Sequence, residues 1–318
     1  MKKCIDGAKL LIENQVKNNE VCIIGVPFSE FQKTYSWTNE FIPGYLDLVS
    51  FDNKSNALSV LASGDHIFNL IVKGITNIDT FDTNRLTEYY ALGFKRAMIL
   101  KYDYDDFILI TRYIDSEYAS IDGISTLILE LLPYMEEKHA IYWKEIVDYN
   151  YKIQKEFDTN LNLFKIMTLH NNFSDMIIYN NYLIGENEYN LLRERLIKSN
   201  ISFKCCNAHN LKDEFVGKYD FILLSNILDY FFKIFKFDWG DEQLQEYEKG
   251  LMDITKSDGV IFLKYIFRYG FNGKVMKKHS LIENSSITIK ELINEEVYGL
   301  RNIPNTKKFD GMILKRVK

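Results

Sequence analysis

One short segment constrains the fold of this chain more than any other. An apolar run over 57–62 leads into Ser63-Gly64-Asp65, and a second apolar run over 77–81 ends in Asp82. Short apolar runs bounded by turn residues are typical of buried parallel strands. Between the two runs, apolar side chains at helical spacing predict a helix over 66–73. The segment therefore predicts two parallel strands joined by a crossover helix.

The same alternation of apolar runs and helical periodicity resumes further along the chain. Strands and helices in alternating order are typical of an α/β fold. We therefore predict an α/β, doubly wound, Rossmann-like and mostly parallel sheet with a β-rich tail, whose last strand lies at or near a sheet edge. The other predicted helices span 85–100, 186–199 and 241–256, and the other predicted strands span 201–206, 219–224, 259–265 and 309–316.

The chain divides by its residue patterns into four segments. Residues 102–175 are rich in Tyr, Glu, Lys and Leu at helical spacing, which predicts a helical insertion after the second strand. This insertion separates two parts of the Rossmann-like domain, 56–101 and 176–318, and a helical segment or lid over 1–55 precedes them. The chain has four prolines and no Gly/Ser-rich linker, so we expect one compact body.

Charge, hydropathy and cysteine spacing argue against several functional classes. A net charge of −5 disfavours a nucleic-acid partner, although a local basic patch could form around Lys274, Lys277 and Lys278. No apolar segment reaches the length needed to cross a bilayer, and the five histidines lack metal-ligand spacing. Cys205 and Cys206 are adjacent and no CxxC occurs, so we expect free thiols in a reducing cytoplasm.

Polar residues follow four of the predicted strands at the point where each strand ends. In open parallel sheets, ligands bind beyond the carboxyl ends of the strands. Each residue alone is also ordinary turn chemistry, but four such ends in order indicate a nucleoside ligand. The chain lacks GxGxxG and GxxxxGK[ST], which favours an adenosyl ligand with a short sulfonium tail over NAD or ATP. In strand order, the residues are Ala62 to Asp65, then Asp82, then Asn207, then Ser225 and Asn226.

Three of these segments carry a resemblance to a known family. They read Val60-Leu-Ala-Ser-Gly-Asp65, Phe81-Asp-Thr-Asn84 and Tyr219-Asp-Phe-Ile-Leu-Leu-Ser-Asn-Ile-Leu-Asp-Tyr230. They resemble class I S-adenosylmethionine-dependent transferases of the Rossmann-like methyltransferase superfamily. More narrowly, they are similar to the betaine-lipid-synthase type of aminocarboxypropyl transferase and its bacterial relatives. The upstream Tyr35-Ser-Trp-Thr-Asn-Glu40 resembles the aromatic and acidic segment that precedes the core there, and the likeness covers residues 35–100 and 182–266.

The resemblance implies a role for each residue around S-adenosylmethionine. The loop residues Gly64 and Asp65 would lie against the methionine moiety, and Asp82 would hold the ribose. Asn207 with Ala208 would flank adenine, although many relatives carry Asp at this position and a fuller glycine-rich loop. Ser225 and Asn226 would face the reactive sulfonium. The other predicted cofactor contacts are Ala62, Ser63, Asn84, and Tyr35 with Trp37, the last two as a lid or as core aromatics.

The activity implied by the resemblance is the transfer of a group from S-adenosylmethionine. Each carbon on a sulfonium is electrophilic, so the protein need only orient an acceptor in line and exclude water. Asn226, Asp229 or Tyr230 would position or deprotonate that acceptor. We expect methyl transfer as the broad class, with 3-amino-3-carboxypropyl transfer as the alternative. A non-catalytic sensor of an adenosyl ligand is a further alternative, and the missing glycines disfavour a nicotinamide-dependent oxidoreductase.

The acceptor is expected to be a small molecule or a lipid-like compound. The run from Tyr230 to Trp239 is unusually aromatic, and it could line an apolar acceptor pocket, rest on a membrane surface or pack as a helix. His66, directly after the loop, could act as a general base. A histidine at a helix start near solvent is the simpler interpretation.

Overall fold

The computed structural model describes residues 1–18, 30–52, 55–169, 173–228, 241–270, 295–302 and 308–317. The chain forms two compact units, which are described separately. The helical unit comprises Met1–Asn39, Leu61–Val72 and Asp82–Ser199, and the sheet unit comprises Glu40–Val60, Lys73–Phe81 and Asn200–Lys318.

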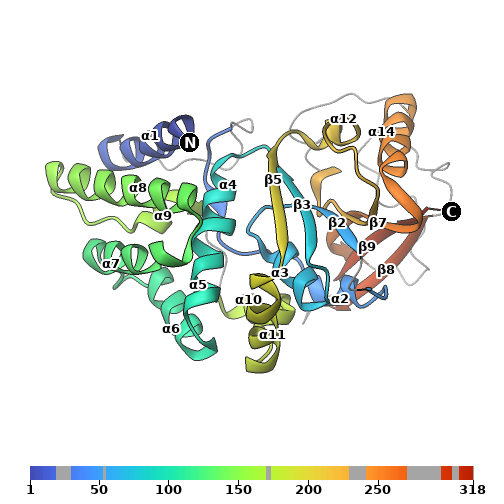
Figure 1. The fold of residues 1–318 in the computed structure, drawn as a ribbon, viewed down its shortest axis with the longest axis horizontal. Helices are drawn as coiled ribbons and strands as arrows, with labels where there is room; N and C mark the ends of the chain where they lie inside the picture. The colour runs from blue at the N-terminus through green and yellow to red at the C-terminus, as the bar shows by residue number, and fades with distance from the viewer. Residues whose placement is uncertain are drawn as a thin grey trace. The chain divides into compact units, whose positions relative to one another are not determined.

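In the part of the sheet unit that the structure describes, seven strands form one sheet in the order β5-β3-β2-β6-β7-β9-β8 (Figure 1). Strand β2 pairs in parallel with β3 and with β6, and β6 pairs in parallel with β7. Strand β9 is antiparallel to both of its neighbours, β7 and β8. The strands are β2 (Asn56–Val60), β3 (Asn77–Asp82), β5 (Asn200–Cys205), β6 (Tyr219–Leu223), β7 (Thr255–Gly270), β8 (Glu295–Asn302) and β9 (Lys308–Arg316).

This sheet confirms the predicted α/β class with a mostly parallel sheet. Numbered along the chain, its first five strands follow the order 3-2-1-4-5, in which the direction of winding reverses between β2 and β6. Strand β2 has a neighbour on each side, and its residues after Asn56 are all buried, including the fully buried Ser59. Its register pairs Val60 with Phe81 and Ala57 with Phe221.

The carboxyl-terminal part of the sheet agrees with the prediction in one respect and differs from it in another. The last strand was predicted at or near a sheet edge, and β9 lies next to the edge strand β8, with Met312, Ile313 and Leu314 buried. The predicted helix over 241–256 ends early, as α14 (Asp241–Asp253). Thr255 instead opens β7, where its β-branched side chain is favourable and its hydroxyl donates to Leu251 O at 2.6 Å.

One short helix contributes to the core of the sheet unit. Helix α2 (Ile42–Leu46) has a proline in its first turn, where the missing N–H costs no intrahelical bond. Its Tyr45 is 1% exposed and packs its ring against Phe262 and Tyr265 of β7, with centroids 5.5 and 6.1 Å away. Aromatic contacts of this kind fix the helix against the middle of the long strand.

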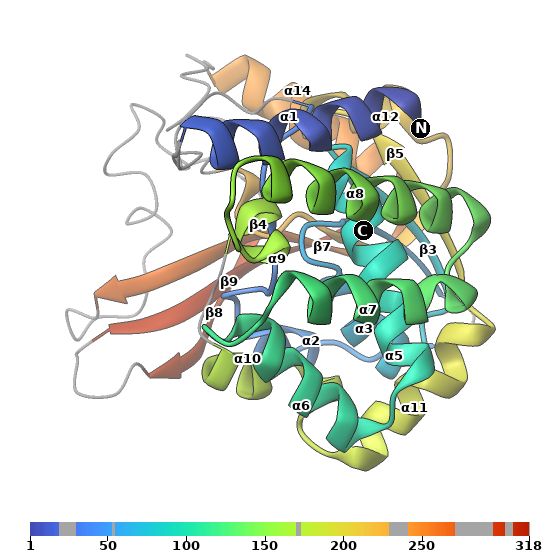
Figure 2. The same cartoon turned by 90° about the vertical axis from the view of Figure 1, so that its left-hand side faces the viewer.

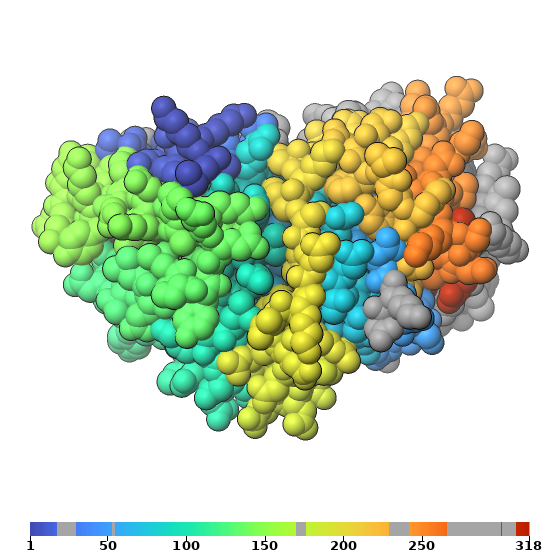
Figure 3. All heavy atoms as spheres, viewed as in Figure 1, coloured from blue at the N-terminus to red at the C-terminus, as the bar shows by residue number. Residues whose placement is uncertain are grey.

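The helical unit contains the predicted insertion as a set of helices. Helix α1 (Lys2–Asn18) lies along α8, as Figures 2 and 3 show. The sequence did not predict a two-stranded parallel pair in this unit, which joins β1 (Thr34–Tyr35) to β4 (Thr168–Leu169). Among the described residues, no helix has the length and apolar composition that crossing a membrane requires. The helices of the insertion are α6 (Tyr104–Asp115), α7 (Ile121–Leu131), α8 (Glu137–Glu156), α9 (Leu163–Met167) and α10 (Phe173–Tyr179).

The two units do not follow the four segments expected from the sequence. Helix α3 (Asp65–Val72) packs on α11 (Glu186–Ile197), and the helix predicted over 85–100 packs on α8. Both therefore belong to the helical unit, although each directly follows a strand of the sheet. The latter helix has three parts, α4 (Leu86–Glu88), the π-helix η1 (Tyr89–Lys95) and α5 (Arg96–Lys101).

Candidate functional site

The loop after β2 has a backbone that few residues adopt. Ala62 has a φ of 44° and Gly64 a φ of 85°, and Gly64 N–H donates to Leu61 O at 2.7 Å. A Cβ on Gly64 would come within 3.0 Å of both Ala91 and Phe68. Glycine is therefore required at this position by backbone conformation and by close packing together.

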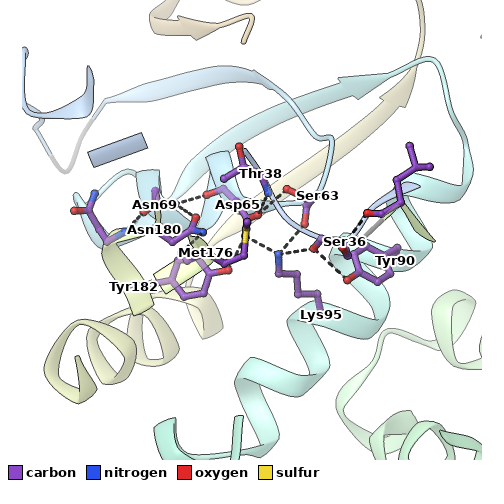
Figure 4. Close-up of polar contacts among 12 residues, drawn as sticks. Ser36, Thr38, Ser63, Asp65, Asn69, Tyr90, Lys95, Met176, Asn180 and Tyr182 are labelled. Atoms are coloured by element: carbon purple, nitrogen blue, oxygen red, sulfur yellow. Dashed lines mark hydrogen bonds and ion pairs between the residues drawn. The ribbon is translucent and has the colours of Figure 1, made fainter. Parts of the chain in front are cut away.

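Asp65 accepts hydrogen bonds on both carboxylate oxygens from within the helical unit (Figure 4). Its Oδ1 accepts from Lys95 Nζ and from the Tyr182 hydroxyl, both at 2.6 Å. Its Oδ2 accepts from Thr38 N at 2.6 Å and from the Ser63 hydroxyl at 2.7 Å. A carboxylate offers about four lone-pair positions. The structure thus commits the fully buried Asp65 side chain to shaping the loop, where the sequence led us to expect contact with a ligand.

Lys95 supplies the counter-charge for Asp65, and the sequence did not single it out. The ammonium also donates to Ser36 O and Ser63 O, each at 3.2 Å, and lies 3.7 Å from the centre of the Trp37 ring. Burial lowers the pKa of Lys95 to about 8, and the neighbouring Asp65 carboxylate opposes this change. Lys95 ends the π-helix η1, a helix type that often marks functional positions.

A pair of asparagines supports this network from the other side (Figure 4). Asn69 Nδ2 donates to Asp65 O and to Asn180 Oδ1, both at 2.7 Å. Asn180 Nδ2 in turn donates to Met176 O at 3.0 Å, and both asparagines are fully buried. Buried amides whose donors are satisfied in this way fix the start of α3 relative to the segment that carries Tyr182.

Asp82 joins the end of β3 to the loop after β2. Its Oδ2 accepts from Ala62 N at 3.1 Å and its Oδ1 from Asn84 N at 2.9 Å. The side chain is half-buried. Burial raises the pKa of Asp82 to about 6, and the backbone N–H groups of Asn84 and Ala62 oppose the rise. The structure therefore brings together the predicted loop and the predicted ribose carboxylate.

The other predicted cofactor contacts of the helical unit are Asn84, Trp37 and Tyr35, which bond or pack with residues inside that unit. Asn84 Nδ2 donates to Gln32 O at 2.9 Å, and its Oδ1 accepts from Leu86 N at 3.1 Å as the next helix begins. Trp37 is 4% exposed beneath the Lys95 ammonium, which agrees with its alternative interpretation as a core aromatic. Tyr35 is half-buried in strand β1.

In the sheet unit, Ser225 follows β6 with a φ of 57°, which is strained for a residue with a side chain. Its hydroxyl donates to the carboxylate of Glu40, which is 2% exposed, and lies 3.3 Å from Asn226 Oδ1. Glu40 lies inside the upstream segment that the resemblance includes, but the sequence did not assign it a contact. Two further predicted catalytic residues, Asp229 and Tyr230, lie outside the described residues.

Asn207 and Ala208 follow β5 in the same unit. Asn207 is exposed and begins the short helix η4 (Ala208–Asn210), whereas Ala208 is 6% exposed. Directly after them, a half-open groove of about 220 Å³ lies between α12 (Leu211–Glu214) and α14, with His209 and Tyr247 in its lining. Burial lowers the pKa of His209, which favours its neutral imidazole.

Replacing Gly64 by alanine is expected to lower the free energy of unfolding by about 1–2 kcal/mol, the usual cost of a left-handed backbone for a residue with Cβ. Urea denaturation measures this change. Gly250→Ala is the matched control, because Gly250 lies within helix α14 and the atoms its Cβ would meet belong to the flexible Lys212 side chain. Equal losses in the two variants would show that the backbone of the loop does not require glycine.

The described residues contain no group of three His, Cys, Asp or Glu side chains placed to hold a metal ion. The polar groups that the structure does bring together are carboxylates, hydroxyls, amides and one ammonium. Such groups recognise the hydroxyl, amino and carboxylate functions of an organic ligand. No protein-family model matches this chain, and no curated protein matches it either.

Proposed function

We propose that this chain is an S-adenosylmethionine-dependent transferase of Rossmann-like fold that methylates a small-molecule or lipid-like acceptor. One observation carries the proposal: the hydrogen bond at 3.1 Å from Ala62 N to the Asp82 carboxylate. This bond joins the loop after the first parallel strand to the acid after the second. A compact loop with a single glycine suits a ligand that has no pyrophosphate to bind.

The strand order supports a ligand site at this edge of the sheet. Its direction of winding reverses between β2 and β6, and ligands of open α/β sheets bind beyond the carboxyl ends of the strands at such a point. Ala62 follows β2, Asp82 ends β3, and the strained Ser225 follows β6. Strained backbone is concentrated at functional sites in proteins.

The residues present fit the parts of the proposed ligand. Asp82 ends β3 and is half-buried, and by the resemblance its carboxylate would hold the ribose. The first N–H groups of helix α3 have no partner within the helix, and a helix N-terminus favours a carboxylate such as that of methionine. By the resemblance, Asn207 and Ala208 would flank adenine. Asp65 supports the loop from behind in this proposal and does not contact the ligand.

In the proposed reaction the protein binds S-adenosylmethionine, orients the acceptor toward it and excludes water from both. S-adenosylmethionine supplies an electrophilic carbon on its sulfonium. Asn226 would hold the acceptor in line with that carbon, and Asp229 or Tyr230 remain candidates for removing the acceptor's proton. The groove beside Ala208 is a candidate place for a ligand ring or an acceptor, because it combines aliphatic side chains with the neutral His209 imidazole.

Calorimetry with S-adenosylmethionine, S-adenosylhomocysteine and NAD tests the proposal. We expect both sulfur ligands to bind and NAD to bind more weakly. If neither sulfur ligand binds at millimolar concentration, the proposal is wrong. Incubation with S-adenosylmethionine and a cell extract then identifies the reaction. S-adenosylhomocysteine as product indicates methyl transfer, methylthioadenosine indicates 3-amino-3-carboxypropyl transfer, and binding without any product indicates a sensor.

A further inference from the structure

Lys95 makes three hydrogen bonds that match the donors of an ammonium group one for one. Its Nζ donates to Asp65 Oδ1 at 2.6 Å, and to Ser63 O and Ser36 O at 3.2 Å each (Figure 4). An ammonium has three N–H donors and no acceptor. We propose that Lys95 is a positioning residue, whose positive charge holds the loop Ala62–Asp65 in the geometry that binds the adenosyl ligand. This inference rests on the proposed function, because it predicts the affinity for that ligand.

The ammonium connects two segments that are distant in sequence. On one side it bonds the loop, through Ser63 and Asp65. On the other side it bonds Ser36 O and lies over the Trp37 ring, and Asp65 reaches the same segment by accepting from Thr38 N. The loop is thereby fixed against residues 36–38 through one charged group.

A neutral amine could not make the same set of bonds. It has two N–H donors and a lone pair, so one of the three oxygens would lose its donor and would face that lone pair. The attraction to the Trp37 ring would also vanish, because it depends on the positive charge. Lys95 is 2% exposed and Asp65 is fully buried, so water has little access to replace the lost contacts. Deprotonation of Lys95 therefore loosens the loop.

The groups around Lys95 determine the pH at which it loses its proton. The charged or titratable side chains that face it are Asp65 from α3, Asp115 from α6, Tyr90 from η1 and Tyr182 from η3 (Asn181–Leu183). Burial lowers the pKa of Lys95 to about 8, and it raises the pKa of both tyrosines well above their usual value. The tyrosines therefore stay neutral while the ammonium loses its proton.

The direction of the pH effect follows from this pKa. The ammonium is present below about pH 8 and disappears above it. If the ligand binds only the charged form, the apparent affinity falls in proportion to the charged fraction, which amounts to about tenfold at one pH unit above the pKa. Ligand binding should thus weaken on the alkaline side while the protein remains folded.

The test compares the affinity of wild-type protein and Lys95→Arg for S-adenosylhomocysteine between about pH 7 and pH 9. Arginine keeps its charge throughout this range. The α-amino group of the ligand titrates near pH 8 as well, but it does so equally with both proteins. We expect the wild-type affinity to fall about tenfold more than that of the variant.

A second measurement needs neither the ligand nor the arginine variant. The emission of Trp37 should change as the nearby ammonium loses its proton, giving a titration near pH 8 that Trp37→Phe abolishes. Parallel pH profiles of affinity for wild-type and Lys95→Arg, or no titration of Trp37 emission, would overturn the inference and leave the proposed function standing. If the wild-type protein binds no adenosyl ligand at any pH, the proposed function fails, and the role assigned to Lys95 in ligand binding fails with it.

Discussion

Asp65→Ala is expected to lower the free energy of unfolding by about 3–5 kcal/mol, the usual cost of removing one partner from a buried ion pair. The variant leaves the Lys95 ammonium 2% exposed without its counter-charge, and it removes the acceptor for Tyr182 OH and Thr38 N. Because the Asp65 carboxylate raises the pKa of Lys95, the variant's Lys95 loses its proton at a lower pH than the wild-type value of about 8, so the loss of stability should shrink as the pH rises toward about 8.

Chemical denaturation of four proteins measures this effect. The set is the wild type, Asp65→Ala, Lys95→Met and the double variant. Because the two charges interact directly, the double variant should lose much less than the sum of the two single variants. Glu194→Ala is the control, since Glu194 pairs with Lys198 on the surface, where both side chains are at least 70% exposed, and its loss should change stability little. Additive losses would contradict a coupled pair.

The parallel part of the sheet could be predicted from the sequence because its signals are local. Strands β2 and β6 are short apolar runs bounded by turn residues, and such runs are typical of buried strands. The glycine at position 64 also indicated a tight loop, and its φ of 85° agrees with that expectation. Asp82 was expected at the end of the second strand and lies there.

The partner of Asp65 could not be predicted, because it depends on packing between distant segments. A carboxylate after a strand looks the same in sequence whether it faces a ligand or a buried lysine thirty positions further on. The available signal was Lys95 itself, a charged residue that directly follows the apolar and aromatic run Tyr89 to Phe94. The π-helix η1 also adds a residue to the turn, so the spacing of a regular α-helix does not hold across the residues that lead to Lys95.

The contact between Glu40 and Ser225 could not be predicted from the sequence either, for a similar reason. These residues are separated by most of the chain, and they meet only because β6 and the segment before α2 fold into one unit. In the same way, a strand could be predicted around Met312 to Leu314, which are buried, but the strands that pair with it could not. The order of strands in the tail depends on the pairing of β8 with β9, which local patterns do not encode.

Asp82→Ala is expected to weaken the binding of S-adenosylhomocysteine at neutral pH by about 1–3 kcal/mol, the usual loss for a charged hydrogen-bond acceptor. Binding by the wild-type protein should also depend on pH. Because burial raises the pKa of Asp82 to about 6, the carboxylate that we propose as the ribose ligand is lost as the pH falls through that value. At one pH unit below the pKa, about a tenth of the protein remains competent, so affinity should fall about tenfold.

Calorimetry between about pH 5 and pH 7.5 checks both expectations, and this range lies below the pKa of Lys95. Asp82→Ala should bind weakly with little pH dependence. Asp79→Ala is the matched control, because Asp79 lies in the same strand but accepts from the Tyr219 hydroxyl at 2.6 Å. If Asp82→Ala keeps the wild-type affinity, Asp82 does not hold the ribose. Equal losses in the two variants would mean that disturbance of β3, and not the carboxylate of Asp82, governs binding.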